Sequence, residues 1–165
     1  MKRNQEINNQ NVFSIQTDLI KAIISRDEVV KYSMNNFKDL KIDENTVIIS
    51  ITDPGSKFIS MDILNKFKDN LSIQFWDIEE QIGNYKPISI EQAKVIKDFV
   101  IKNKDNNFIV HCEAGMSRSA AVGLFIYYII EHNEDRYSFQ TSPNPIKEHQ
   151  RYHPNWAVFD VISKI

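Results

Sequence analysis

The chain of 165 residues carries a formal net charge of −2, with 42% hydrophobic and 25% charged residues. A chain of this length can bury one core, and the composition excludes an intrinsically disordered protein. The charge also argues against broad electrostatic binding to nucleic acid, which needs a clustered basic face.

The first part of the chain predicts a loose lead-in followed by a helix. Residues 1–11 are almost entirely polar, and we expect no regular structure there. Ser25 and Glu28 have the spacing of a capping box, in which each side chain bonds the backbone N–H of the other residue. This pattern predicts a helix that begins after Ser25 and ends near Phe37.

The middle of the chain alternates between strand and helix patterns. The β-branched run Thr46–Thr52 predicts a buried strand, and the Asp-Pro-Gly sequence at 53–55 predicts the turn after it. A short amphipathic helix is predicted over 62–68, and a second strand is predicted over 71–76.

The second half of the chain continues this alternation. A second capping box, at Ser89 and Gln92, predicts a helix, and residues 107–111 predict a third strand. The remaining predicted elements are a mostly apolar helix over 117–132, a loop marked by Pro143 and Pro145, and a short helix over 155–165.

Strands that alternate with helices are typical of a central parallel sheet. We therefore predict a single α/β domain over residues 1–165, with a central, mostly parallel sheet and helices on both faces. In such sheets, ligands bind beyond the carboxyl ends of the strands.

One short loop combines the residue types that bind and attack a phosphate group. The third predicted strand ends at His111, Cys112 opens the loop, and Arg118 closes it where the apolar helix begins. Amides of a tight loop before a helix form a nest for anions, and an arginine adds two parallel hydrogen bonds. Gly115 permits a backbone conformation that other residues resist. The same positive field favours a nucleophilic thiolate at Cys112.

The His-Cys-x5-Arg-Ser sequence at 111–119 resembles the signature of the protein tyrosine phosphatase superfamily, in particular its small dual-specificity and atypical members. The order of elements resembles theirs over roughly residues 45–130, and the two ends of the chain resemble theirs only loosely. The resemblance implies the family's parallel-sheet fold and a reaction through a phosphocysteine.

The resemblance also implies a role for each residue of the loop. Cys112 would attack phosphorus, Arg118 would hold the phosphate oxygens, and Ser119 would help the thiolate leave. His111 would orient the loop and tune the thiolate without touching substrate. The implied substrate-binding residues are Glu113, Ala114, Gly115, Met116, Ser117 and Arg118.

The implied reaction needs a general acid that protonates the leaving oxygen. In the family this acid is an Asp on a loop some thirty-odd residues before the cysteine, and Asp77 lies 35 positions before Cys112. Asp53 lies 59 positions before Cys112, which is too far for that pattern. Glu79 and Glu80 follow in the same loop as Asp77. Asp77 is therefore the preferred acid, and Asp53, Glu79 and Glu80 remain alternatives.

No metal site or cofactor is expected. His149 and His153 are four residues apart, but Pro154 breaks a helix there and no third ligand is evident, so both are expected at the surface. Four aromatic residues are expected in the core, although they could also wall the pocket: Phe75, Trp76, Tyr85 and Trp156.

The expected function is hydrolysis of phosphomonoesters, foremost phosphotyrosine, with phosphoserine and phosphothreonine as further substrates, in proteins or peptides. A phosphoinositide or RNA 5′-phosphatase is an alternative, which the acidic Glu113 and the lack of basic residues at 113–117 weaken. Sulfur transfer or arsenate reduction is a further alternative, but low-molecular-weight arsenate reductases need more cysteines. The intact Cys112, Arg118 and Ser119 argue against an inactive module that binds phosphoproteins.

The expected compartment is the cytoplasm. The one cysteine allows no internal disulfide, which is typical of a reducing compartment. Residues 1–11 do not resemble a signal peptide, and the apolar run at 120–130 is shorter than the ~20 helical residues that cross a bilayer. We therefore expect no membrane partner and no nucleic-acid partner.

Overall fold

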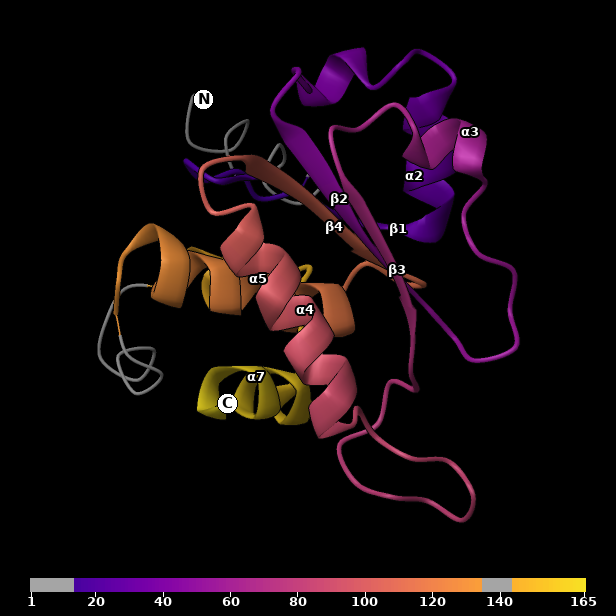
Figure 1. The fold of residues 1–165 in the computed structure, drawn as a ribbon, viewed down its shortest axis with the longest axis vertical. Coiled ribbons are helices and arrows are strands. Elements are labelled where there is room, and N and C mark those ends of the chain that lie inside the picture. The colour runs from indigo at the N-terminus through magenta and orange to yellow at the C-terminus, as the bar shows by residue number, and fades with distance from the viewer. Residues whose placement is uncertain (1–13, 135–143) are drawn as a thin grey trace, which may run out of the picture.

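A four-stranded sheet forms the centre of the molecule in the computed structural model, which describes residues 14–134 and 144–165 (Figure 1). The strands lie in the order β1-β4-β2-β3, and all three pairings are parallel. The four strands are β1 (Ile20–Ser25), β2 (Thr46–Thr52), β3 (Asn70–Gln74) and β4 (Asn107–Cys112). The predicted α/β fold is therefore confirmed, with a sheet that is parallel throughout.

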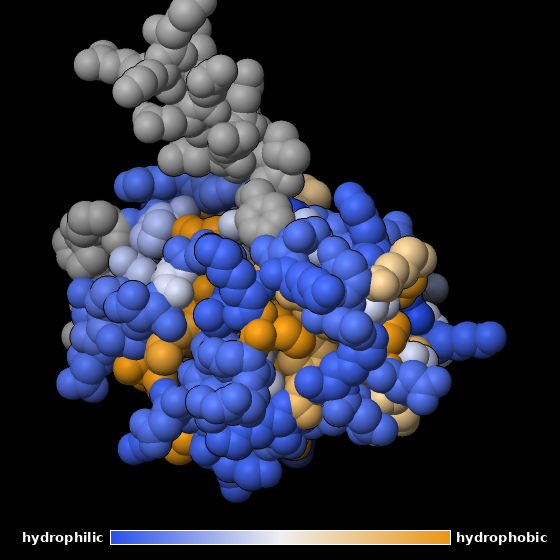
Figure 2. Space-filling model, turned by 90° about the horizontal axis from the view of Figure 1, so that it is seen from above, coloured by the Kyte–Doolittle hydropathy of each residue, from blue (hydrophilic) through white to orange (hydrophobic). Residues whose placement is uncertain are grey.

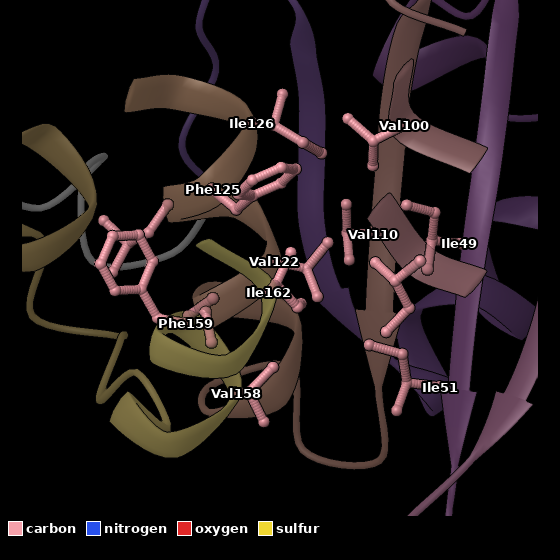
Figure 3. Packing of buried hydrophobic residues seen from close by; sticks show 14 of the residues in the cluster. Ile49, Ile51, Val100, Val110, Val122, Phe125, Ile126, Val158, Phe159 and Ile162 are labelled. Atoms are coloured by element: carbon pink, nitrogen blue, oxygen red, sulfur yellow. The ribbon is translucent and has the colours of Figure 1, made fainter. Parts of the chain in front are cut away.

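Helices cover both faces of the sheet, because successive side chains of a strand point to opposite sides. On one face, Ile49 and Ile51 of β2 and Val110 of β4 pack in one large apolar cluster (Figure 3). The helices that contribute to this cluster are α4 (Ile90–Lys102), α5 (Arg118–Phe125), α6 (Pro145–Glu148) and α7 (Trp156–Lys164), with the π-helix η2 (Ile126–Glu131) after α5.

The opposite face carries a smaller apolar cluster. Ile24, Ile48 and Ile109 of the sheet pack there against Val29 and Leu64. The elements on this face are α2 (Arg26–Ser33), α3 (Met61–Leu64) and the short 3-10 helix η1 (Lys38–Leu40). Figure 1 shows α2 and α3 on the side of the sheet away from α5 and α7.

The helix α5 lies in the middle of the larger cluster, and all eight of its residues are buried. Val122 and Phe125 of α5 lie between the sheet and α7, which contributes Val158 and Ile162 (Figure 3). The start of α5 is consequently fixed by packing, and this position matters because the loop after β4 ends there.

Both predicted capping boxes are present. Ser25 and Glu28 exchange their two hydrogen bonds at the start of α2, and Ser89 and Gln92 do the same at the start of α4. Each box satisfies two N–H groups that a helix leaves unpaired at its first turn.

Several predicted boundaries were wrong. The helix α2 ends at Ser33 rather than near Phe37, because Asn36 and Phe37 adopt left-handed φ angles of 57° and 58°. The predicted helix over 117–132 is present as the continuous run of α5 and η2 over 118–131, and only its last six residues differ from an α-helix. Pro145 does not lie in a loop; it begins α6, where its missing N–H costs nothing.

Two predicted features, the lead-in over 1–11 and Pro143, lie outside the described residues. Of the aromatic residues expected in the core, Phe75 is buried, Trp76 and Trp156 are half-buried, and Tyr85 is exposed, so the prediction was wrong for Tyr85. Its ring packs edge-on against Trp76, with 4.8 Å between the ring centroids.

The surface in Figure 2 is largely hydrophilic, with apolar side chains visible between charged and polar ones. In the ranges 14–134 and 144–165, no helix combines the length and the apolar character needed to cross a membrane.

Candidate active site

The loop over residues 112–118 joins β4 to α5 at the carboxyl ends of the strands. Its first residue, Cys112, is only 1% exposed, and its Sγ lies 3.1 Å from the hydroxyl oxygen of Ser119. Ser119 is fully buried in the first turn of α5. The hydroxyl is therefore placed to donate a hydrogen bond to a thiolate.

The backbone of this 112–118 loop turns its carbonyl oxygens outward. The carbonyl of Glu113 accepts from Arg26 N (3.2 Å), that of Met116 from His153 N (2.9 Å), and that of Ser117 from Asn155 N (3.1 Å). No described residue accepts a hydrogen bond from the N–H groups of residues 113–117, and no side chain caps α5. Free amides at a helix start are the nest that the sequence predicted for an anion.

Gly115 allows this turn. Its φ of 68° lies in the left-handed region, and a Cβ there would come within 2.3 Å of Ser25 N and 2.4 Å of Ile24 C. Both atoms belong to the backbone of β1, so a side chain at Gly115 would push the loop away from the sheet.

The guanidinium of Arg118 is 3% exposed and is anchored along one edge. Its Nη1 donates to Phe75 O at 2.6 Å, and its Nη2 lies 2.8 Å from Asp53 Oδ1. Its buried Nε has no partner among the residues the structure describes. Nε and the second proton of Nη2 have the parallel arrangement with which an arginine can bind two oxygens of a phosphate.

His111 lies behind the loop and is fully buried. Burial lowers its pKa to about 4, so the imidazole is neutral at pH 7. Its Nδ1 lies 3.3 Å from Cys112 O and its Nε2 lies 2.6 Å from Ser50 Oγ. Because a carbonyl only accepts, Nδ1 carries the proton and Nε2 accepts from the Ser50 hydroxyl.

Asp77 lies beside the 112–118 loop. Its Oδ1 accepts hydrogen bonds from Ser117 Oγ at 2.7 Å and from Asn155 Nδ2 at 3.0 Å. Asp77 follows β3 and begins a loop over residues 77–88, in which residues 79–86 are exposed. The structure thus brings the carboxylate that the spacing favoured next to the residue before Arg118.

The alternative carboxylates have other partners. Asp53 pairs with Arg118, and Glu79 Oε1 accepts from Trp156 N at 3.0 Å. Glu80 is exposed in the 77–88 loop. Glu113, expected to bind substrate, lies 3.2 Å from Arg26 Nη1.

Residues near the carboxyl-terminal helix also support the loop, and the sequence did not assign them. Arg151 forms an ion pair with Glu28, whose two carboxylate oxygens both accept from the guanidinium. Burial raises the pKa of Glu28, but hydrogen bonds from Arg151 and Ser25 outweigh burial and lower it overall. The 149–155 segment contacts the 112–118 loop through His153 N and Asn155 N, which donate to Met116 O and Ser117 O.

The histidines weighed as a metal pair lie near this segment. His153 is exposed, and the ring of His149, which is half-buried, lies 4.9 Å from that of Tyr152. In the parts of the chain that the structure describes, no group of three or more His, Cys, Asp or Glu side chains could hold a metal ion.

Comparison with known proteins supports the fold. No protein-family model and no curated protein matches the sequence. The structure of Tk-PTP in the active form is 11% identical with a TM-score of 0.53, covering 87% of this chain and 89% of that one. PTPMT1 in complex with PI(5)P is 15% identical with a TM-score of 0.52, covering 87% and 85%.

A human tyrosine phosphatase-like serine/threonine/tyrosine-interacting protein is 16% identical with a TM-score of 0.50, covering 90% of this chain and 91% of that one. At these identities the likeness concerns the fold. The chain has the fold of the tyrosine phosphatases, as the resemblance around the Cys-x5-Arg sequence implied.

Proposed function

We propose that this chain is a cysteine-dependent phosphomonoesterase whose preferred substrate is phosphotyrosine in proteins or peptides. The observation that carries the proposal is the buried Nε of Arg118, which has no partner among the described residues, at the end of a loop whose N–H groups at 113–117 donate to none of them either. A buried donor left unsatisfied costs about 1–3 kcal/mol, and a phosphate oxygen that accepts from it removes this cost. The fork of Arg118 is thus organised for a tetrahedral oxyanion before substrate binds.

Four side chains carry out the proposed reaction. The Cys112 thiolate attacks phosphorus, the bond to the leaving oxygen breaks, and Asp77 transfers its proton to that oxygen. Water then attacks the phosphocysteine, Asp77 takes a proton from this water, and the thiolate leaves with a hydrogen bond from Ser119. Arg118 and the loop amides hold the equatorial oxygens in both steps.

The surroundings of the site favour an aromatic phosphate over a polyanion. The two arginines beside the loop, Arg26 and Arg151, are both paired with glutamates, which offset their charge. The loop after β2 (residues 53–60), the 77–88 loop and the 112–118 loop each bear an exposed apolar side chain. These are Phe58 (52% exposed), Tyr85 (53%) and Met116 (39%). Such side chains suit a tyrosine ring and flanking peptide better than an inositol ring that carries several phosphates.

A trapping experiment tests the chemistry. Wild-type protein quenched in acid during turnover of p-nitrophenyl phosphate should carry phosphate on Cys112, identified by mass spectrometry of peptides. Cys112→Ser should lose turnover and still bind vanadate, because the amides and Arg118 remain. Phosphate trapped on another residue, or turnover by Cys112→Ser, would contradict the proposal.

A substrate panel tests the specificity. A phosphotyrosine peptide should give a higher kcat/KM than a phosphoserine peptide, RNA with a 5′-triphosphate, or PI(5)P in vesicles. One structural neighbour was solved with PI(5)P, so this lipid is the sharpest competitor. Equal or better turnover of PI(5)P would replace the phosphotyrosine assignment. Absence of turnover with every substrate, together with tight binding of phosphopeptides, would favour a binding module.

A further inference from the structure

We propose that Asn155 is a positioning residue for the general acid: its side-chain amide holds Asp77 with one defined oxygen available for proton transfer. The inference rests on the proposed function, because it assigns a role within the same reaction. Asn155 is only 3% exposed and lies just before α7, at 78 positions from Asp77 in the sequence.

The hydrogen bonds of Asn155 fix the orientation of its amide. Its Oδ1 accepts from Val158 N at 3.2 Å and thereby caps α7. Because an N–H group needs an acceptor, this bond identifies the oxygen and directs Nδ2 to the other side. There Nδ2 donates to Asp77 Oδ1 at 3.0 Å and lies 3.3 Å from Ile78 O.

The same residue joins the two loops of the site. The backbone N–H of Asn155 donates to Ser117 O at 3.1 Å, while its side chain holds Asp77. The Ser117 hydroxyl donates to the same Asp77 oxygen at 2.7 Å. Asn155, Ser117 and Asp77 therefore form a closed arrangement in which the carboxyl cannot move without breaking two bonds.

This arrangement distinguishes the two oxygens of Asp77. Oδ1 accepts two hydrogen bonds, whereas Oδ2 has no partner within the described part of the chain. A protonated carboxyl carries its hydrogen on one oxygen and accepts through the other. Two donors on Oδ1 hold it as the accepting oxygen, so the proton for the leaving group resides on Oδ2.

Only an amide side chain can both cap α7 and donate a hydrogen bond to Asp77. An aspartate or a serine can cap α7 as well as an asparagine does, but neither offers an N–H to Asp77. Asn155→Asp retains the capping oxygen and places a second carboxylate against Asp77. Asn155→Ser also retains a cap, but its side chain is too short to reach Asp77. Asn144→Ser is the matched control, because Asn144 caps α6 in the same way through Ile146 N and Lys147 N.

The experiment compares a poor and a good leaving group. With phenyl phosphate, Asn155→Ser should lower kcat by about 10–100-fold, below the ~10²–10⁴-fold worth of the acid itself, and Asn155→Asp should lower it further. With p-nitrophenyl phosphate, whose leaving group is already acidic, kcat should fall less than about threefold for Asn155→Ser. Vanadate affinity and the kcat of Asn144→Ser should stay near wild type.

A second readout separates positioning from a general structural role. In an Asp77→Asn background, Asn155→Ser should change kcat for phenyl phosphate less than about threefold, because the residue it positions is gone. Equal losses on both aryl phosphates, or equal losses with and without Asp77, would overturn the inference. If wild-type protein hydrolyses neither aryl phosphate, the proposed function fails instead. Should Asn155→Ser fold poorly, Asn155→Asp with its intact cap gives the same comparison.

Discussion

The 112–118 loop and the 77–88 loop lie side by side at the carboxyl ends of the strands, but they are held very differently. Three outward carbonyl bonds, a glycine packed on β1 and a fully buried helix fix the first loop. In the second loop residues 79–86 are all exposed, and it is joined to its neighbours at Asp77, Ile78 and Glu79.

This difference separates two tasks of a phosphatase. The part proposed to bind phosphate is built rigidly into the core, whereas the part proposed to supply a proton depends on a few hydrogen bonds at the start of the 77–88 loop. Changes in the first region should therefore alter anion binding and stability. Changes in the second should alter the proton transfers to the leaving group and from water, and leave anion binding unchanged.

The largest effect is expected at the exposed loop. Asp77→Asn should slow phosphotyrosine turnover by ~10²–10⁴-fold, the usual worth of a general acid, while p-nitrophenyl phosphate turnover falls far less. Vanadate binding, measured by calorimetry, should not change. Glu80→Gln is the control in the same loop. If Glu79→Gln or Glu80→Gln shows the dependence on leaving group and Asp77→Asn does not, the acid is misassigned.

A substitution in the buried loop should affect binding and rate together. Arg118→Lys keeps the charge but loses the fork, so we expect kcat/KM to fall by about 10²–10³-fold with both aryl phosphates. Vanadate affinity should fall as well, in contrast to Asp77→Asn. Arg26→Lys, at an arginine that pairs with Glu113, should cost less than about tenfold. Near-normal rates for the Arg118→Lys variant would exclude Arg118 as the clamp.

A substitution at Gly115 tests the rigidity of the buried loop through the free energy of unfolding. Gly115→Ala should lower the free energy of unfolding by about 2–5 kcal/mol, from a left-handed φ and a clash with β1. Gly83→Ala has a similar φ of 58° but open space around it, so about 1–2 kcal/mol is expected. Urea unfolding of the two variants gives the comparison. Equal losses of unfolding free energy in the two variants would mean that the contact between Gly115 and β1 relaxes to accept a side chain.

The last expected effect is a change of protein stability with pH. The pKa of His111 is about 4 in the folded protein because of burial, below its ordinary value of 6.5. Between these values the unfolded chain binds more protons, so stability should fall as pH drops from 6.5 to 4, by at most about 3 kcal/mol. Above pH 6.5 this contribution is fully present. His111→Gln should flatten that part of the stability profile, measured by urea unfolding between pH 4 and pH 7.

The fold and the buried loop were predictable because their signals are local. Cys112, Gly115 and Arg118 lie within seven consecutive residues, between a strand and a helix that show clear patterns. β1 was missed although its residues are largely apolar. It has six residues interrupted by Lys21, and it pairs only with β4 at the edge of the sheet. A run this short predicts a strand no more strongly than an irregular segment that leads into the capped helix α2.

The contacts that support the site could not be predicted from the sequence, for a different reason. Asn155 was recognised as the start of a helix, and that helix is present as α7. Its contact with Asp77 spans 78 positions, and the contact of Arg151 with Glu28 spans 123. No periodicity or cap pattern connects such distant residues, because their meeting depends on how α7 packs against α5.

The pairing of Arg151 with Glu28 also has a consequence for how the protein folds. Contacts between residues so far apart in sequence carry a large loop-closure entropy and form slowly. The strand and helix that flank Cys112 can form early, but the loop between them gains two of its three outward carbonyl bonds only when residues 149–155 arrive. A refolding chain should accordingly recover helical circular dichroism before it recovers oxyanion binding, so that catalytic competence is among the last properties the molecule acquires.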